Sequence, residues 1–183
     1  MNITSAHPFL STPFSFLVMG VSGSGKSHIG RQLAAETSAV FIDADDYHSP
    51  ENVAKMSRGE PLTDMDRESW LKTLSELYRE HQATGTSLVI GCSALRRHYR
   101  DVLRQGAPEL HILYLHGSRE VLLERINTRG SHFFAGEHML NSQLDTLELP
   151  GTDEAIMCSI ENTPKEIIDN FLDELSRRIS ETQ

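Results

Sequence analysis

Residues 20–27 read GVSGSGKS and decide the fold of this chain. They match the pattern G-x-x-x-x-G-K-[ST], the P-loop that cradles the phosphates of ATP or GTP. The apolar residues 14–19 before the motif predict a short buried strand, and residues 29–36 after it predict a helix. Strand, loop and helix in this order turn backbone N–H groups towards a phosphate. We therefore expect a nucleotide site formed by Gly20, Ser22, Gly23, Ser24, Gly25, Lys26 and Ser27.

The motif also assigns roles to single side chains. We expect Lys26 to reach the β- and γ-phosphates and to act in catalysis, and the Ser27 hydroxyl to bind Mg²⁺. Gly20 and Gly25 allow a close approach of the backbone that a side chain would block. ATP and Mg²⁺ are the cofactors that this reading requires.

Composition narrows the class of protein. The 183 residues suit one domain with a full core. The net charge of −9 argues against a nucleic-acid partner, and no apolar run approaches the length of a membrane span. The first twelve residues lack the features of a signal peptide. We expect a cytoplasmic protein with a flexible lead-in over about residues 1–13 and with Cys92 and Cys158 as buried thiols.

Strand-like and helix-like segments alternate along the chain. Apolar segments at 14–19, 40–42, 88–90, 111–115 and 155–160 are separated by helical patterns. This alternation predicts an α/β fold with a parallel five-stranded sheet and helices on both faces. Ligands of such sheets bind beyond the carboxyl ends of the strands. The polar residues at 20–27, 43–48 and 91–97 each follow a strand, so we expect them to share one crevice.

Two long insertions interrupt the alternation. One covers about residues 49–70 and the other about residues 129–151, and we expect a cover on the substrate side and a lid. Within or beside the first insertion, Asp66 has the position of a helix N-cap. A later helix is expected over residues 95–105, with Ser93 as its N-cap.

Asp43 and Asp45 follow the second strand. Side chains two apart in an extended backbone point to the same side, so the two carboxylates can take different roles at one site. Asp43 would help to hold Mg²⁺ through water, and Asp45 would accept a proton from a substrate hydroxyl. The alternative is that they cap the next helix or stay solvated. His48 is either a neutral donor to a substrate oxygen or an ordinary loop residue.

Arginines gather in two further places. The segment 93–100 holds three of them, and a guanidinium beside a helix start is a good carboxylate site, although a solvated basic face is the ordinary reading. Arg96 and Arg97 point to different sides of a helix, so only one of them can bind the substrate carboxylate. Arg125 and Arg129 lie four apart on one helix face before the lid. They would neutralise charge on the transferring phosphoryl group, or else are surface residues.

Four stretches together resemble one family. Residues 19–27, 43–52 continued by 59–67, 92–101, and the lid residues 132–134 with 142–144 are similar to the gluconokinases, the small P-loop kinases of gluconate. The resemblance spans about residues 16–179. The family usually has glycine where this chain has Ala44, a change that removes neither carboxylate.

This resemblance implies ATP-dependent phosphorylation of D-gluconate at its 6-hydroxyl to 6-phospho-D-gluconate. It also implies a nucleoside-monophosphate-kinase-like fold with a lid, Mg²⁺ dependence and commonly a homodimer. Catalysis would rest on Lys26, Asp45 and Arg129, with Arg125 at the nucleotide. The residues expected at the substrate are Asp45, His48, Arg67, Ser93, Arg97 and His132.

Three other functions compete with this one. A shikimate kinase would share the paired aspartates, but the segments 92–101 and 132–140 match only the gluconate family. A nucleotide switch without catalysis would need neither Asp45 nor the lid arginines. A nucleoside monophosphate kinase would need to bind an acceptor phosphate, for which residues 49–70 offer only Lys55, Arg58 and Arg67.

Overall fold

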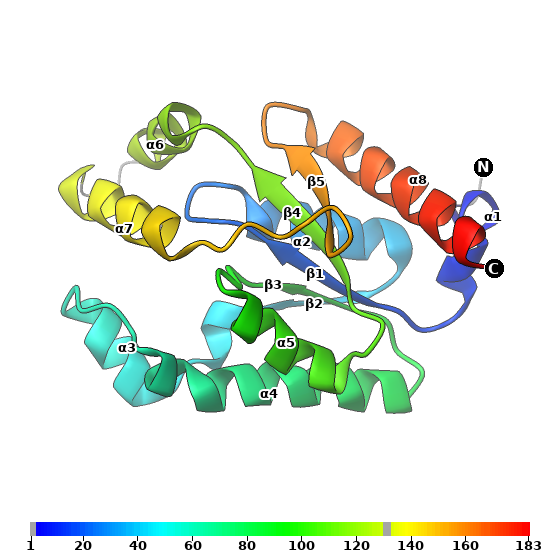
Figure 1. The fold of residues 1–183 in the computed structure, drawn as a ribbon, viewed down its shortest axis with the longest axis horizontal. Coiled ribbons are helices and arrows are strands. Elements are labelled where there is room, and N and C mark those ends of the chain that lie inside the picture. The colour runs from blue at the N-terminus through cyan, green and yellow to red at the C-terminus, as the bar shows by residue number, and fades with distance from the viewer. Residues whose placement is uncertain (1–2, 130–132) are drawn as a thin grey trace.

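The computed structural model describes residues 3–129 and 133–183, and a five-stranded parallel sheet lies at its centre (Figure 1). The expected α/β fold is therefore confirmed. The strand order is β2-β3-β1-β4-β5. The strands are β1 (Ser15–Met19), β2 (Val40–Asp43), β3 (Leu88–Gly91), β4 (His111–His116) and β5 (Ala155–Ser159).

The register of the strands brings the polar segments to one edge. Val18 near the end of β1 pairs with Gly91 at the end of β3, and Gly91 pairs with Asp43 at the end of β2. All pairs are parallel, so the residues that follow these strands emerge side by side. The P-loop follows the central strand and thus lies in the middle of this edge.

Helices cover both faces of the sheet and make two half-cores (Figure 1). Alternate residues of β1 divide between them: Phe16 and Val18 pack with α2, α6 and α8, whereas Leu17 and Met19 pack with α4 and α5. The helices are α1 (Ile3–Ala6), α2 (Lys26–Thr37), α3 (Pro50–Ser57), α4 (Asp64–Ala83), α5 (Arg97–Gly106), α6 (Arg119–Thr128), α7 (Phe133–Thr146) and α8 (Pro164–Thr182), with short 3₁₀ turns η1 (Pro8–Ser11) and η2 (Ala44–Tyr47). Cys92 and Cys158 are buried free thiols, as expected.

Two helix starts differ from the prediction. The N-cap of α4 is Thr63, and Asp66 is the third helical residue, whose carboxylate accepts the Thr63 N–H in a capping box. Helix α5 begins at Arg97 instead of Leu95, and Ser93 does not cap it. Ala94 has a φ of +46°, which breaks a helix that would otherwise begin at Ser93.

The segment expected as a lead-in contains two short helical turns from Ile3 onwards. Ile3–Ala6 form one turn of helix, and the buried His7 shares a hydrogen bond of 2.6 Å with Ser176 on α8. Phe9 packs on the edge of the half-core. Sequence reasoning missed this arm because its apolar residues are few and have no regular period.

The second insertion is only partly separate from the core. Helix α7 lies beside α6 (Figure 1), and Arg119 on α6 donates hydrogen bonds to Asn141 and Glu137 on α7, at 2.9 and 2.8 Å. Leu140 is fully buried in the core. No helix in the described ranges is long and apolar enough to cross a bilayer.

Candidate active site

The P-loop connects β1 to α2 at the centre of the sheet edge. A side chain at Gly20 would lie 2.9 Å from the carbonyl oxygen of Leu115, so the loop can follow β4 this closely only with glycine there. Gly25, the N-cap of α2, has a φ of +90°, which a larger residue adopts only with strain. The helix therefore starts directly beneath the loop, where its free N–H groups attract an anion.

Lys26 lies within a group of charged residues. Its Nζ donates to the carbonyl oxygen of Val21 at 3.3 Å. Burial lowers the pKa of the ammonium, the carboxylates of Asp45 and Asp43 oppose this, and the positive charge of Arg129 adds to it. Lys26 therefore interacts electrostatically with the other charged residues predicted for phosphoryl transfer.

Asp43 connects the P-loop to the second strand. The Ser27 hydroxyl donates to Asp43 Oδ2 at 2.9 Å, and the Asp45 N–H donates to Asp43 Oδ1 at 3.0 Å. The strand ends at Asp43, and Asp45 belongs to the 3₁₀ turn η2, so the expected extended geometry for the pair is wrong. The turn nevertheless keeps both carboxylates near Lys26.

The donor set at Ser27 and Asp43 fits a magnesium ion. A hydroxyl and a carboxylate 2.9 Å apart offer the oxygen ligands that Mg²⁺ prefers. Within residues 3–129 and 133–183 no cluster of three or more His, Cys, Asp or Glu side chains could hold a metal alone. Mg²⁺ typically takes one or two protein ligands and completes its shell with water and phosphate, which this site allows.

Asp45 follows β2 at the carboxyl end of the sheet, and its side chain is 85% exposed. The protein around the crevice raises the pKa of Asp45 by desolvation, and the neighbouring Asp43 raises it further, against the opposing charges of Lys26 and His48. A carboxylate of raised pKa beside a bound hydroxyl is a suitable general base.

His48 is held in place by Trp70. The two rings stack with centroids 4.1 Å apart at 20°, and the indole Nε1 donates to the carbonyl oxygen of Ala44 at 2.7 Å. The His48 side chain is 4% exposed and lies 3.9 Å from Asp45, and burial lowers its pKa. Its buried Nδ1 finds no hydrogen-bond partner among the described residues. The other ring nitrogen, Nε2, lies on the side of Asp45, where a neutral imidazole suits a substrate hydroxyl.

A cluster of polar side chains continues the crevice beyond His48. Arg67 donates to the phenol oxygen of Tyr99 at 3.1 Å, and Tyr99 donates to Asp64 at 2.5 Å. Arg96 lies 3.6 Å from Asp64. The sequence analysis missed Asp64 and Tyr99, although both lie in stretches that carried the family resemblance.

The structure separates the two arginines at the start of α5. Arg97 is exposed and makes no hydrogen bond or ion pair with the described residues, whereas Arg96 faces the Arg67 cluster. Arg96 is therefore better placed than the predicted Arg97 to meet a substrate anion. Ser93 is half-buried in the loop between β3 and α5.

The two lid arginines differ in their partners. Arg125 donates to the carbonyl oxygen of Ile160, and its guanidinium passes 4.0 Å from the position of a Cβ at Gly25. Arg129 is exposed at the C-cap of α6 and acts on Lys26 through its charge. His132, the remaining predicted substrate residue, lies outside the described residues.

Gln143 on α7 also contacts the P-loop. Its Oε1 accepts the backbone N–H of Ser22 at 2.5 Å. The sequence does not predict this contact, because nothing in an isolated glutamine indicates a partner more than a hundred residues away.

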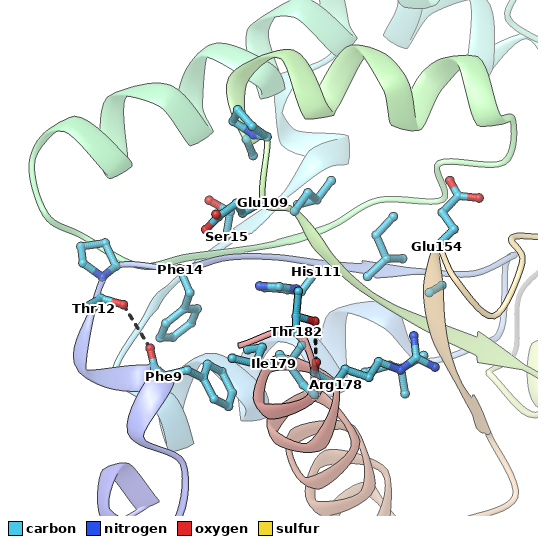
Figure 2. Close-up of a pocket in the computed structure, with 18 of the residues that line it drawn as sticks. Phe9, Thr12, Phe14, Ser15, Glu109, His111, Glu154, Arg178, Ile179 and Thr182 are labelled. Carbon is cyan, nitrogen blue, oxygen red and sulfur yellow. Dashed lines mark hydrogen bonds between the residues drawn. The ribbon is translucent and has the colours of Figure 1, made fainter.

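A separate cavity of about 940 Å³ lies at the opposite edge of the sheet (Figure 2). It is lined by the N-terminal arm, the starts of β1 and β4, and the end of α8, including Phe9, Phe14, His111 and Ile179. Because parallel α/β sheets bind their ligands at the carboxyl ends of the strands, this cavity is not the candidate active site.

Comparisons with known proteins agree with this geometry. Residues 16–150 match the family model described as an AAA domain. The thermoresistant gluconokinase of Escherichia coli K12 is 45% identical over 76% of this chain and 79% of its own length. A crystal structure of a gluconokinase from Sinorhizobium meliloti 1021 superposes with a TM-score of 0.82 at 41% identity, covering 94% of this chain and 98% of that one. A sugar kinase from Janibacter sp. HTCC2649 gives 0.83 at 45% identity, covering 89% and 94%.

Proposed function

The chain belongs to the gluconokinase family of P-loop kinases, and from that premise we propose that it transfers the γ-phosphoryl group of ATP to the 6-hydroxyl of D-gluconate. The products are 6-phospho-D-gluconate and ADP. The shikimate alternative is not favoured, because the named relatives are gluconokinases.

On the nucleotide side, the backbone N–H groups of the P-loop and of the start of α2 hold the phosphates, for which the Ser22 N–H must leave Gln143 and the Ser24 N–H must leave the Val21 carbonyl. Lys26 contacts the transferring group, for which its ammonium must leave the Val21 carbonyl. Ser27 would hold Mg²⁺ directly, and Asp43 would hold it through water. The bound ion would neutralise charge on the β- and γ-phosphates. Arg129 approaches from the end of α6 and stabilises charge that develops in the transition state. Arg125 supports the nucleotide side of the loop.

On the acceptor side, Asp45 takes the proton from the 6-hydroxyl of gluconate as the oxygen of that hydroxyl attacks the γ-phosphorus. His48, oriented by Trp70, contacts a neighbouring hydroxyl through Nε2, the ring nitrogen on the side of Asp45. Arg67, with Arg96 in place of Arg97, binds the carboxylate end, and Ser93 and His132 contact the remaining hydroxyls. Gluconate is a polyol with one carboxylate, so a base, neutral donors and a cation are the groups it needs.

The observation that carries the proposal is the position of Asp45. Its carboxylate lies 3.9 Å from His48 Nε2 and follows Asp43, which binds Ser27 of the P-loop, so one side chain can reach both an acceptor hydroxyl and the transferring group. By the same resemblance we propose that the protein is a homodimer and is located in the cytoplasm. Light scattering on the purified protein tests the dimer.

The direct test is an ADP-release assay over gluconate, glucose, sorbitol, shikimate and AMP, with Lys26→Ala as the blank. Gluconate should give the highest kcat/KM. Glucose and sorbitol lack the carboxylate that Arg67 and Arg96 would bind, so we expect their kcat/KM to fall below that of gluconate by roughly 10²-fold or more. Comparable values for glucose and gluconate, or a preference for shikimate, would refute the proposed substrate.

A further inference from the structure

Arg100 on α5 is a buried cation that the proposed chemistry does not use. Its side chain is 1% exposed, and its partner Glu154 is 6% exposed. A buried guanidinium is tolerated only when its charge and its N–H donors are satisfied. The hydrogen-bond acceptors of Arg100 therefore show which segments of the chain it joins.

The acceptors belong to three separate segments. Nε donates to Glu154 Oε1 at 2.7 Å, just before β5. Nη1 donates to the carbonyl oxygen of Ala94 at 2.8 Å, and Nη2 donates to the carbonyl oxygen of Glu148 at 3.1 Å. The planar guanidinium thus fixes the relative positions of points that are far apart in the sequence.

One of these segments carries predicted substrate residues, and a second is bonded to it. Ala94 lies in residues 92–96, here called the acceptor loop, which presents Ser93 and Arg96. Glu148 lies in residues 147–150, the return limb that follows α7, whose Gln143 contacts the P-loop. The Glu148 N–H also donates to the Leu95 carbonyl oxygen at 2.7 Å, so the loop and the limb are joined directly.

The backbone of the acceptor loop needs this support. Ala94 has a φ of +46°, a conformation that is unfavourable for alanine and persists only when the surroundings hold it. Arg100 binds the carbonyl of this same residue. Without that bond, residue 94 would relax towards an ordinary conformation and displace Ser93.

We propose that Arg100 is a positioning residue for the phosphoryl acceptor: it holds the strained turn at Ala94 and locks the acceptor loop to the return limb of the lid. This inference rests on the proposed function, because it predicts a defect specific to gluconate. Arg100 touches neither the P-loop nor α2, so nucleotide binding should not depend on it.

The test compares Arg100→Lys with Arg104→Ala. Lysine keeps the charge but cannot reach all three acceptors. Arg104 binds the same Glu154 carboxylate at 2.6 Å and makes no bond to the loop or limb in the described structure, so it is the matched control. For each variant, KM for gluconate, kcat, Kd for a non-hydrolysable ATP analogue and the thermal midpoint are measured.

We expect Arg100→Lys to raise KM for gluconate by roughly tenfold or more, with Kd for the analogue unchanged. For the control Arg104→Ala, both KM for gluconate and Kd for the analogue should stay within about twofold of the wild-type values. The additional change Ala94→Gly should restore part of the loss, since glycine adopts a positive φ without support.

Equal losses in gluconate and nucleotide affinity, equal effects of the two arginine variants, or a folded Arg100→Lys with wild-type kinetics would each overturn the inference. If Arg100→Lys does not fold, Glu154→Gln decides: KM for gluconate should rise by roughly threefold or more with nucleotide affinity intact, and no change overturns the proposal. A wild-type protein that does not phosphorylate gluconate would instead refute the proposed function.

Discussion

Asp45 is the side chain on which the proposed transfer depends most. Asp45→Asn keeps the shape but cannot accept a proton, so kcat should fall by about 10²–10⁴-fold while the Kd for ATP stays unchanged. Stopped-time assays at saturating substrates, with calorimetry for ATP, measure the two effects. A decrease of kcat below about threefold would leave Asp45 with a structural role only.

The same carboxylate sets the acid side of the pH profile. Desolvation, and then Asp43, raise the pKa of Asp45 above the 3.8 of a free aspartate. A base works only when deprotonated, so kcat/KM should decrease as the pH falls through this raised value, earlier than for an ordinary aspartate. The residual activity of Asp45→Asn should lack this decrease. If Asp45→Asn showed the same decrease of kcat/KM at low pH as the wild type, the decrease would belong to another titrating group.

Arg129 and Arg125 should separate in kinetics because their surroundings differ. Arg129 is exposed near Lys26, and its loss in Arg129→Ala should lower kcat by roughly 10²–10³-fold at saturating substrates. Arg125 is bound to the Ile160 carbonyl, and Arg125→Ala should mainly raise KM for ATP, by about tenfold. Wild-type kcat in Arg129→Ala would show that Lys26 and the metal supply the catalytic charge alone.

At the level of the elements, the start of α4 forms the base of the acceptor side. The Asp66 carboxylate accepts from Lys55 Nζ at 2.7 Å and from the Thr63 N–H at 2.8 Å, and it thereby joins α3 to α4. These bonds, the one from Lys55 first, lower the pKa of Asp66 from 3.8 to about 2.

This shift predicts a pH dependence of stability. A carboxylate with a lowered folded pKa stabilises the protein above its unfolded pKa and loses that contribution as the pH falls towards the folded value. The urea midpoint of the wild type should therefore exceed that of Asp66→Asn at pH 6, and the difference should shrink as the pH falls from about 4 to about 2. A difference that stays constant over this range would rule out this role for the carboxylate.

How much of each element the sequence predicts depends on the range of the interactions that form it. The five strands and the P-loop were predictable, because their apolar runs and glycines are local signals. The start of α5 was not, since the conformation of Ala94 depends on Arg100 and, through it, on Glu148 and Glu154. The contact between Gln143 and Ser22 is likewise a product of the tertiary fold.

Across the whole molecule, the parallel sheet explains why the predicted site residues meet. Asp43, Lys26 and the acceptor loop follow β2, β1 and β3, which are neighbours in the sheet. The choice of Arg96 over Arg97 and the helical turns of the N-terminal arm needed the three-dimensional structure, because both depend on packing between distant segments. Arg67 and Tyr99 lie on α4 and α5, which cover one face of the sheet, whereas Arg125 lies on α6 on the other face (Figure 1).

The most direct test of the account is the position of the phosphate in the product. Gluconate labelled with carbon-13 at its sixth carbon is incubated with ATP and Mg²⁺, and the mixture is followed by phosphorus and carbon NMR, with Lys26→Ala as the blank. The account predicts one phosphate ester, coupled to the labelled carbon and formed in equal amount to ADP. An ester at another carbon, or inorganic phosphate without any ester, would contradict it.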